Sequence, residues 1–205
     1  MIDFHTGPTS NGQRVAVMLE ECGLAYRTRR YDLHKGEHRT AEFLAIAPSG
    51  RIPVIVDDDG PGGAPVTLTQ SAAILVYLAE KTGRYLPAER LARLRAWEWL
   101  MFAMTDVVPT SASIFYETAL LPAKSEANQG WHEKRLVDFL RAADARLERS
   151  EWLAGELSIA DFALYPVTVV RQAVIDRAGG LPGLARWQRA LAGRPGVARG
   201  MATAD

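Results

Sequence analysis

Two runs decide how this chain folds: residues 50–56 read GRIPVIV and residues 67–78 read TLTQSAAILVYL. The first is a β-rich strand entered through Pro53, and the second is a short strand followed by a helix that begins at Gln70–Ser71. A proline at the start of a strand leaves a backbone edge beside it, and a helix start offers unpaired N–H groups that favour an anion. Placed close together, these two features could hold a small peptide-like acid.

The residues before this block alternate between strand and helix patterns. We predict strands over 1–5, 26–33, 52–56 and 66–68, helices over 13–22, 41–47 and 70–82, a loop of turn residues over 7–12, and a long hairpin turn at DDDGPGG. The order is therefore β-α-β-α-β-β-α. The βαβ unit is expected to be parallel and right-handed, and the last two strands antiparallel.

The second half of the chain shows helical periodicity and no strand pattern. Apolar residues recur at helical spacing over 88–118 and 131–149, and further helices are predicted from Ser158 and over 184–191. We therefore predict an α/β domain over residues 1–82, a linker over 83–88, and an all-helical domain over 89–205.

The composition is that of an ordinary globular protein. Of its 205 residues, 48% are apolar and 23% are charged, and 24 Lys and Arg balance 24 Asp and Glu. This balance points to neither nucleic acid nor an anionic membrane. The single cysteine, Cys22, allows no internal disulfide, and we find neither a signal peptide nor a transmembrane stretch. We expect a cytoplasmic protein.

Three places along the chain could carry chemistry, and each has a structural alternative. A cis peptide at Pro53 would turn the Ile52 backbone toward an extended ligand, although most X-Pro bonds are trans. Ser71 in a first helical turn could bind a carboxylate, or could be a simple N-cap. Thr9 and Asn11 could donate to a thiolate and lower its pKa, or could form an ordinary turn and cap.

Other residues favour structural roles. Ser158 and Asp161 have the spacing of a capping box. His34 and His38 are four residues apart, but no third metal ligand is evident, so we predict no metal site. The sequence contains no phosphate-binding loop, dinucleotide-binding fingerprint, zinc-protease motif or serine-hydrolase motif.

The order and spacing of these elements resemble the cytosolic glutathione transferases over nearly the whole chain. The matching motifs are TSNG after the first strand, RIPVIV, TQSAAIL, WLAGELSIADFALYP and the closing RPGV. The TSNG loop, with EECGLAY and YDLHKGEH, is most similar to the bacterial Nu-class, which is related to the yeast prion-type group. The resemblance implies a thioredoxin-like N-terminal domain, an all-helical C-terminal domain and a homodimer.

The resemblance also implies glutathione as co-substrate, with no other cofactor and no metal. The residues that match the glutathione site of the family are Thr9 and Asn11 near the sulfur, Ile52 and Pro53 beside the cysteinyl part, Gln70 and Ser71 at the γ-glutamyl end, and His38 and Arg51 at the glycyl end. Three positions depart from the family. Gln70 replaces the usual Glu, His38 stands where Gln is common, and Trp131 stands where an Arg usually reaches the partner subunit.

The leading hypothesis is a glutathione transferase whose Thr9 and Asn11 stabilise the thiolate for attack on a disulfide, a peroxide or an electrophilic carbon. The class resemblance favours disulfide-bond reductase or peroxidase activity. Two alternatives are a binding protein on the same fold that carries glutathione or an apolar ligand without turnover, and a purely structural interaction module. The sequence does not identify the second substrate.

Overall fold

The computed structural model describes residues 1–203, which form two compact units. One comprises residues 1–84 together with residues 193–203, and the other comprises Tyr85–Ala192. The first is α/β and the second is helical, so the predicted fold class is confirmed. The residues after Gly193 pack with the first unit, whereas the sequence assigns them to the helical domain. The limits of the functional domains stay a prediction.

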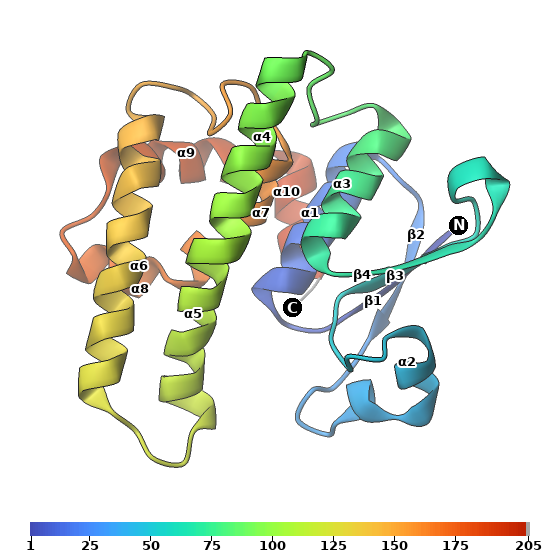
Figure 1. Cartoon of the computed structure of the whole chain (residues 1–205), viewed down its shortest axis with the longest axis horizontal. Coiled ribbons are helices and arrows are strands. Elements are labelled where there is room, and N and C mark those ends of the chain that lie inside the picture. Colours follow the sequence, from blue (N-terminus) through green and yellow to red (C-terminus); the bar gives the residue numbers. More distant parts are fainter. Residues whose placement is uncertain (204–205) are drawn as a thin grey trace. The chain divides into compact units, whose positions relative to one another are not determined.

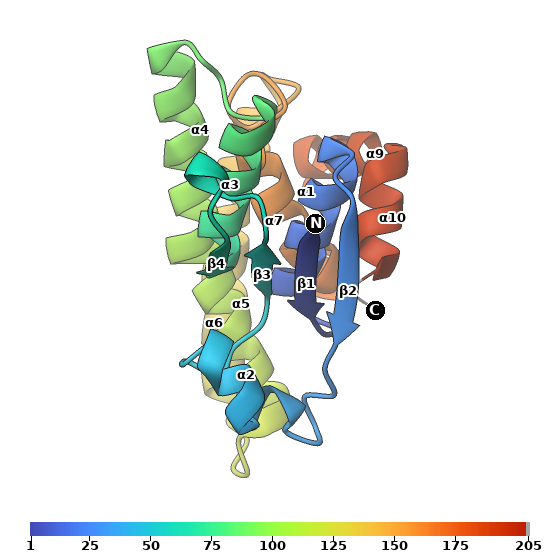
Figure 2. The ribbon, with the colours of Figure 1, turned by 90° about the vertical axis from the view of Figure 1, so that its right-hand side faces the viewer.

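The first unit contains one four-stranded sheet, with strands in the order β2-β1-β3-β4 (Figure 2). The strands are β1 (Ile2–Thr6), β2 (Tyr26–Arg30), β3 (Val54–Asp57) and β4 (Val66–Thr69). β1 and β2 are parallel and β3 and β4 are antiparallel, as predicted. β3 is also antiparallel to β1, which the sequence analysis did not predict.

Two strand limits differ from the prediction by two residues or more, and the others differ by one residue at most. β3 begins at Val54, after Pro53, rather than at residue 52. β2 ends at Arg30 rather than continuing to Leu33. The Asp32 carboxylate accepts hydrogen bonds from the backbone N–H groups of His34 and Lys35, at 2.9 and 3.1 Å. This turn ends the extended backbone.

The helices of the first unit are α1 (Ser10–Cys22), α2 (Ala41–Ile46), α3 (Ser71–Thr82) and α10 (Pro195–Thr203). The prediction that residues 10–12 belong to a loop was wrong, because Thr9 caps α1 and the helix starts at Ser10. Gly12 lies inside the first turn, where a Cβ would overlap the Thr6 hydroxyl. Gly23, at φ 68°, ends α1 as predicted.

The helices cover both faces of the sheet (Figure 1). α1 and α3 pack together on one face. On the other face, Phe43 of α2 and Ala47, which directly follows that helix, form a small core with Val54 of β3. Tyr31 and Ile52 pack against this core. α2 therefore supports the entry to β3, the segment that carries Pro53.

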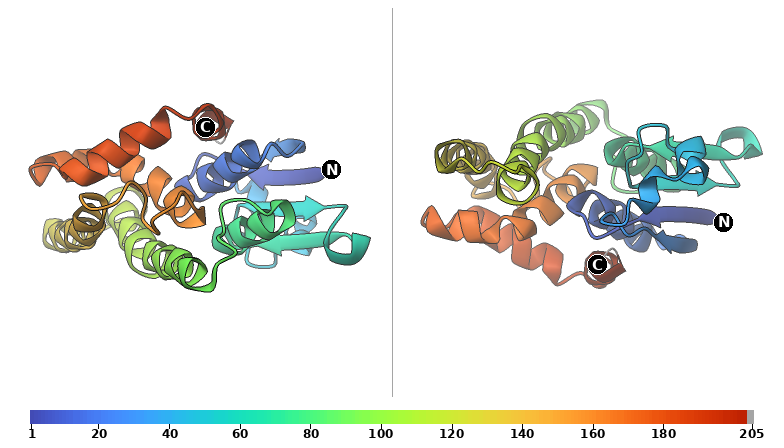
Figure 3. Two further views of the ribbon diagram at one scale, coloured as in Figure 1. Left: turned by 90° about the horizontal axis from the view of Figure 1, so that it is seen from above. Right: turned by 90° about the horizontal axis from the view of Figure 1, so that it is seen from below.

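The last helix, α10, was not predicted, and it lies along α1 (Figure 3). Two glycines, Gly196 and Gly200, lower its intrinsic helix propensity. They also permit close packing, because a Cβ at Gly200 would overlap the Val17 backbone. The Arg194 guanidinium forms an ion pair with Glu21 at 2.6 Å. Packing on α1 therefore stabilises a helix that its own sequence disfavours.

The second unit contains only helices: α4 (Arg90–Phe102), α5 (Val108–Phe115), α6 (Glu126–Leu147), α7 (Ile159–Val170), α8 (Gln172–Arg177) and α9 (Pro182–Ala192). A π-helical turn over Ala103–Val107 joins α4 to α5. Pro109 follows that turn and lacks the N–H that a regular helix would use. The short α8 was not predicted.

The start of α7 is a capping box, as predicted from Ser158 and Asp161. The Asp161 carboxylate is completely buried and accepts from the backbone N–H groups of Leu153 and Ser158 and from the indole of Trp187, at 3.1, 3.0 and 2.8 Å. Asp161 thus joins three segments of the second unit. Among the helices of residues 1–203, none is both long and apolar enough to cross a membrane.

Candidate functional site

The strand register of the first unit gathers the predicted site segments at one edge of the sheet. His5 of β1 pairs with Val54 of β3, and Val54 pairs with Thr69 of β4. The end of β1, the start of β3 and the end of β4 therefore meet. Residues 7–11, 52–53 and 70–71 follow or precede these strand ends directly, so they lie at the same edge.

Thr9 is the N-cap of α1, with extended backbone at φ −141° and ψ 150°. Its Oγ1 accepts a hydrogen bond from the Gly12 N–H at 3.1 Å. The capping interpretation of this residue is thus confirmed. A hydroxyl can accept and donate at once, and within residues 1–203 the Thr9 O–H has no acceptor. The cap therefore leaves one donor available at the sheet edge.

Arg14 links two of the predicted site residues, and the sequence reasoning did not select it. Its guanidinium is fully buried, and its Nη1 donates both to Oδ1 of Asn11 and to Oγ of Ser71, the latter at 3.0 Å. Burial lowers the pKa of Arg14 to about 9. This value is still above neutral pH, so the side chain stays protonated there. The spacing of three residues from Asn11, one helical turn, is the sequence signal that could have identified Arg14.

Ser71 is the first residue of α3, and it is 5% exposed. It therefore occupies the first helical turn rather than the N-cap position, which is the alternative that favours anion binding. Gln70 takes the cap position with φ 69° and ψ 106°, and its side chain makes no capping hydrogen bond. Gln70 is exposed, and nothing within residues 1–203 ties its side chain to Arg14 or Asn11.

In the hydrogen bonds to Thr9, Asn11 and Ser71 the side chain of each residue is the acceptor. In each side chain the oxygen accepts from a protein N–H: from Gly12 at Thr9, and from Arg14 at the other two. Within the described part of the chain, the Thr9 and Ser71 hydroxyl hydrogens and the Asn11 Nδ2 hydrogens have no acceptor. Donors without acceptors at a helix start form an environment suited to an anion.

Ile52 and Pro53 lie beside this group of donors. The peptide bond between them is cis, which settles the alternative left open by the sequence. The Ile52 side chain lies against Gly7, where a Cβ would be 3.2 Å from its Cδ1. Residue 52 precedes the paired part of β3, and its N–H and C=O bond to no other group in residues 1–203. This backbone edge is available to an extended ligand.

No hydrogen bond or ion pair within residues 1–203 joins His38 or Arg51 to the donors around Arg14. His38 lies in a 3₁₀ turn over Glu37–Arg39, and its Nδ1 is buried without a partner within residues 1–203. The next residue, Arg39, packs over Gly50, with its Nη1 3.1 Å from the position of a Cβ there. This contact brings the turn next to the exposed Arg51.

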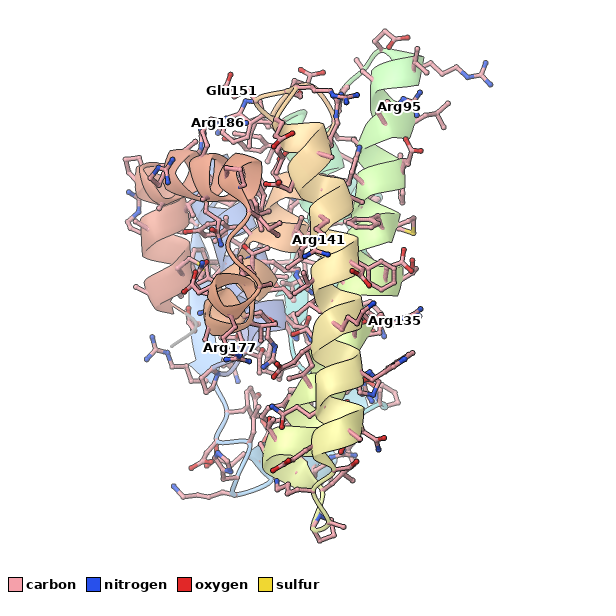
Figure 4. The ribbon with its side chains drawn as sticks, turned by 90° about the vertical axis from the view of Figure 1, so that its left-hand side faces the viewer. Arg95, Arg135, Arg141, Glu151, Arg177 and Arg186 are labelled. Carbon is pink, nitrogen blue, oxygen red and sulfur yellow. The ribbon has the colours of Figure 1, made fainter. Side chains whose placement is uncertain are left out.

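The second unit holds a cavity of about 360 Å³ between α6 and α8, lined by residues that include Arg141 and Arg177, both labelled in Figure 4. Its three cations are engaged in ion pairs: Arg177 with Glu133 at 2.8 Å, and both Lys134 and Arg141 with Asp138, at 3.1 and 3.5 Å. The cavity therefore offers little uncompensated charge. In the same unit Trp131 is 57% exposed. No group of three or more potential metal ligands occurs within residues 1–203.

Comparison with known proteins finds similarity to glutathione transferases and to a disulfide-bond oxidoreductase. Residues 10–81 match the N-terminal domain of glutathione S-transferases. The chain is 35% identical to the disulfide-bond oxidoreductase YfcG of Escherichia coli, with 100% of this chain and 96% of that protein covered.

Two solved structures are also similar. A Burkholderia graminis glutathione transferase with two glutathione molecules bound per subunit has a TM-score of 0.91 and 31% identity, with 98% of this chain and 87% of that chain covered. A Pseudomonas putida glutathione transferase with one glutathione disulfide bound per subunit has a TM-score of 0.90 and 31% identity, with 98% and 90% covered.

The chain belongs to the glutathione transferase family. This membership confirms the family predicted from the RIPVIV and TQSAAIL motifs, whereas the finer resemblance to the Nu-class stays a prediction.

Proposed function

We propose that this protein reduces small disulfides with glutathione as co-substrate and with no other cofactor. The observation that carries the proposal is the set of donors on Thr9, Asn11 and Ser71, whose oxygens are already bonded within the protein. The likeness to YfcG, a disulfide-bond oxidoreductase, favours a disulfide over a peroxide or an electrophilic carbon as second substrate. The cytoplasm, which keeps thiols reduced, is the location that fits this reaction.

In this proposal the glutathione thiolate would lie at the start of α1, where the Thr9 hydroxyl and the Asn11 amide would donate to the sulfur. Hydrogen bonds to the ionised form lower the pKa of a thiol. The fraction of reactive thiolate at neutral pH then rises. Thr9 and Asn11 thus act as electrostatic stabilisers, and no proton has to be removed by a side-chain base.

The remaining parts of glutathione fit the other site segments. The γ-glutamyl carboxylate would accept from the Ser71 hydroxyl and from the N–H groups at the start of α3, and the Gln70 amide would accept from the ammonium. The backbone of Ile52 would pair with the cysteinyl residue. The glycyl carboxylate would lie near His38 and Arg51, where two cationic or donor side chains meet an anion.

The reaction is thiol–disulfide exchange in two steps. The bound thiolate attacks one substrate sulfur, a mixed disulfide with glutathione forms, and the other substrate sulfur leaves as a thiolate and takes a proton from water. A second glutathione thiolate then attacks the glutathione sulfur of the mixed disulfide. This step releases the second substrate thiol and glutathione disulfide. The two glutathiones lose two electrons in total, and the substrate gains them. The two glutathiones held by the B. graminis relative support such a cycle.

A homodimer forms part of the proposal. On α4, Leu91, Leu94 and Met101 are 61%, 56% and 40% exposed and share one helix face. An apolar face of this kind is suited to a second copy of the chain. Light scattering on the wild type should give the mass of two chains, and Leu91→Glu with Leu94→Glu should give the mass of one. A monomeric wild type would contradict this part.

Turnover of hydroxyethyl disulfide with glutathione tests the catalytic proposal. We expect Thr9→Ala with Asn11→Ala to lower kcat at least about a hundredfold, because removing one preorganised donor to a reacting anion typically costs that much. Thr67→Ala with Asn128→Ala is the matched control, since both residues are exposed and lie outside the site. Unchanged turnover in the double variant, with circular dichroism like that of wild type, would remove Thr9 and Asn11 from the mechanism.

Binding measurements separate the two alternatives from an enzyme. A protein that binds glutathione without turnover would be retained on a glutathione column, yet would be inactive toward a broad panel of disulfides, peroxides and electrophiles. A structural module would show no rise in Tm with millimolar glutathione, whereas specific binding raises stability by mass action.

A further inference from the structure

We infer that Arg14 is a positioning residue, whose buried guanidinium holds Asn11 and Ser71 so that both present hydrogen-bond donors to glutathione. The inference rests on the proposed glutathione site and deepens it. Arg14 acts through its two neighbours, and no contact between its own side chain and glutathione is required.

The geometry of Arg14 joins two parts of the site that are distant in sequence. A single nitrogen, Nη1, donates to Asn11 one turn earlier in α1 and to Ser71, 57 residues later, at the start of α3. The Arg14 side chain has no exposed surface. Both site residues therefore lie within hydrogen-bond reach of one atom whose position is fixed by packing.

The chemistry of a guanidinium sets the orientation of both partners. Arginine has N–H donors and no acceptor, so only an oxygen can face it. The Asn11 amide must therefore turn its Oδ1 toward Arg14 and its Nδ2 hydrogens away. The Ser71 hydroxyl must likewise turn a lone pair toward Arg14, which leaves its hydrogen free to donate elsewhere. Arg14 thus makes donors of two side chains that could otherwise be either donors or acceptors.

This polarity is the one that glutathione requires. The thiolate and the γ-glutamyl carboxylate are both anions and accept hydrogen bonds. Without the guanidinium, the Asn11 amide and the Ser71 hydroxyl could bond to each other or to water in either sense, and ordering them would have to accompany binding. The positive charge of Arg14 next to both groups also favours anions at this edge of the sheet.

A purely structural role is the competing explanation, because Arg14 also ties α1 to α3. That role predicts a loss of stability when Arg14 is replaced, with no change in the affinity for glutathione and none in the pKa of its thiol. The positioning role predicts changes in both of these quantities. Ligand affinity and thiol ionisation, measured on folded variants, therefore separate the two explanations.

The first experiment compares wild type, Arg14→Met and Arg14→Lys. We expect Arg14→Met to raise KM for glutathione about tenfold to a hundredfold, the range for hydrogen bonds to charged groups. The pKa of the bound thiol, followed by thiolate absorbance and by the pH profile of kcat/KM, should rise toward that of free glutathione. Arg14→Lys should recover part of both effects, because an ammonium donates but lacks the planar fork. A folded Arg14→Met with unchanged KM and pH profile would overturn the inference.

A double-mutant cycle tests whether Arg14 acts through Ser71. Arg14→Met, Ser71→Ala and the combination should show strong non-additivity in KM, since the second change removes a group that the first has already released. Full additivity would contradict action through Ser71. The cycle can be run with Arg14→Lys if Arg14→Met does not fold, and the same outcomes apply.

Arg194→Met is the matched control, because it removes a cation paired with Glu21 elsewhere in the same unit. It should lower Tm without moving KM or the pH profile. The wild-type protein tests the proposed function separately. If wild type did not bind glutathione, the proposed function would be overturned. If wild type were active and Arg14→Met behaved like wild type, only the role of Arg14 would be overturned.

Discussion

Two helix starts in this protein each carry a serine, but the two serines differ in position and in hydrogen-bond partners. At the start of α7, Ser158 is the N-cap, and the Asp161 carboxylate of the same helix accepts from the Ser158 N–H at 3.0 Å. At the start of α3, Ser71 is the first helical residue, and its hydroxyl accepts from Arg14 rather than from its own helix. The serine at the start of α7 is bonded to an acid of its own helix, whereas the serine at the start of α3 is bonded to Arg14 of α1.

We infer from this comparison that the charge of the side chain bonded to the serine decides the role of the helix start. An internal carboxylate satisfies the donors at α7, so that start is closed and contributes to stability. At α3 the neighbouring group is a guanidinium, which uses up acceptors and leaves donors, so the start is open to an external anion. Replacing these residues should therefore affect stability at α7 and ligand affinity at α3.

The largest effect is expected from Asp161→Ala. This change leaves the buried N–H groups of Leu153, Ser158 and Trp187 without their acceptor, and we expect it to lower the free energy of unfolding by about 3 to 5 kcal/mol. Urea denaturation followed by circular dichroism measures the change. Asp138→Ala is the control, because Asp138 is exposed and its partners within residues 1–203 are two surface cations, at 3.1 and 3.5 Å. If Asp161→Ala lowered the free energy of unfolding no more than Asp138→Ala does, the stabilising role of Asp161 at the start of α7 would be refuted.

The pH dependence of stability tests the same residue. Complete burial raises the pKa of Asp161 from 3.8 to about 6, against the opposing effect of its hydrogen bonds to Trp187, Leu153 and Ser158. The folded chain then holds this proton more tightly than the unfolded chain, so the contribution of Asp161 to stability falls as the pH rises from about 4 through about 6.

Denaturation of wild type and Asp161→Asn at several pH values measures this contribution, since Asn does not titrate. The stability of wild type relative to the variant should fall by the order of 2 to 3 kcal/mol across that pH range. A relative stability that stays constant, or that rises with pH, would show that the hydrogen bonds outweigh burial.

Ser71→Ala sharpens the comparison directly, with Ser158→Ala as its matched partner. We expect Ser71→Ala to raise KM for glutathione about tenfold or more, because a hydrogen bond to a carboxylate is lost. Ser158→Ala should instead lower stability by about 1 kcal/mol through loss of the cap, with KM unchanged. Equal effects of the two changes on KM would remove the distinction between the two helix starts.

The smallest effect is expected from Gln70→Glu. Gln70 is exposed beside Ser71, so a carboxylate there would gain a solvent-screened attraction to the γ-glutamyl ammonium. KM for glutathione should fall by about twofold to fivefold, the range for exposed ion pairs. Gln70→Asn, which shortens the side chain without adding charge, is the control. A rise in KM for Gln70→Glu would place the ammonium elsewhere.

Several features were predictable because they depend on nearby residues. The capping box needs only the spacing of Ser158 and Asp161, and the end of α1 needs only the left-handed backbone that Gly23 adopts at φ 68°. The strand pattern of residues 52–56 and the motifs around Pro53 and Ser71 were likewise readable. Together with TSNG, WLAGELSIADFALYP and RPGV, and with the order of these motifs along the chain, they predicted the family that the comparisons then showed.

Other features depend on residues that only folding brings together. The backbone of Gly12 fits against the Thr6 hydroxyl where no Cβ could, and α10 packs closely on α1 because Gly200 lies against the Val17 backbone. Neither contact is visible as a local pattern.

The sequence by itself thus determined the strands, most of the helices other than α8 and α10, and which side chains could meet an anion, since these properties arise from local propensity and spacing. The tertiary structure alone decided that Arg14 lies between Asn11 and Ser71, and hence which atoms of the two face outward. Hydrogen-bond polarity depends on the partner across the site, and that partner is 57 residues away from Ser71.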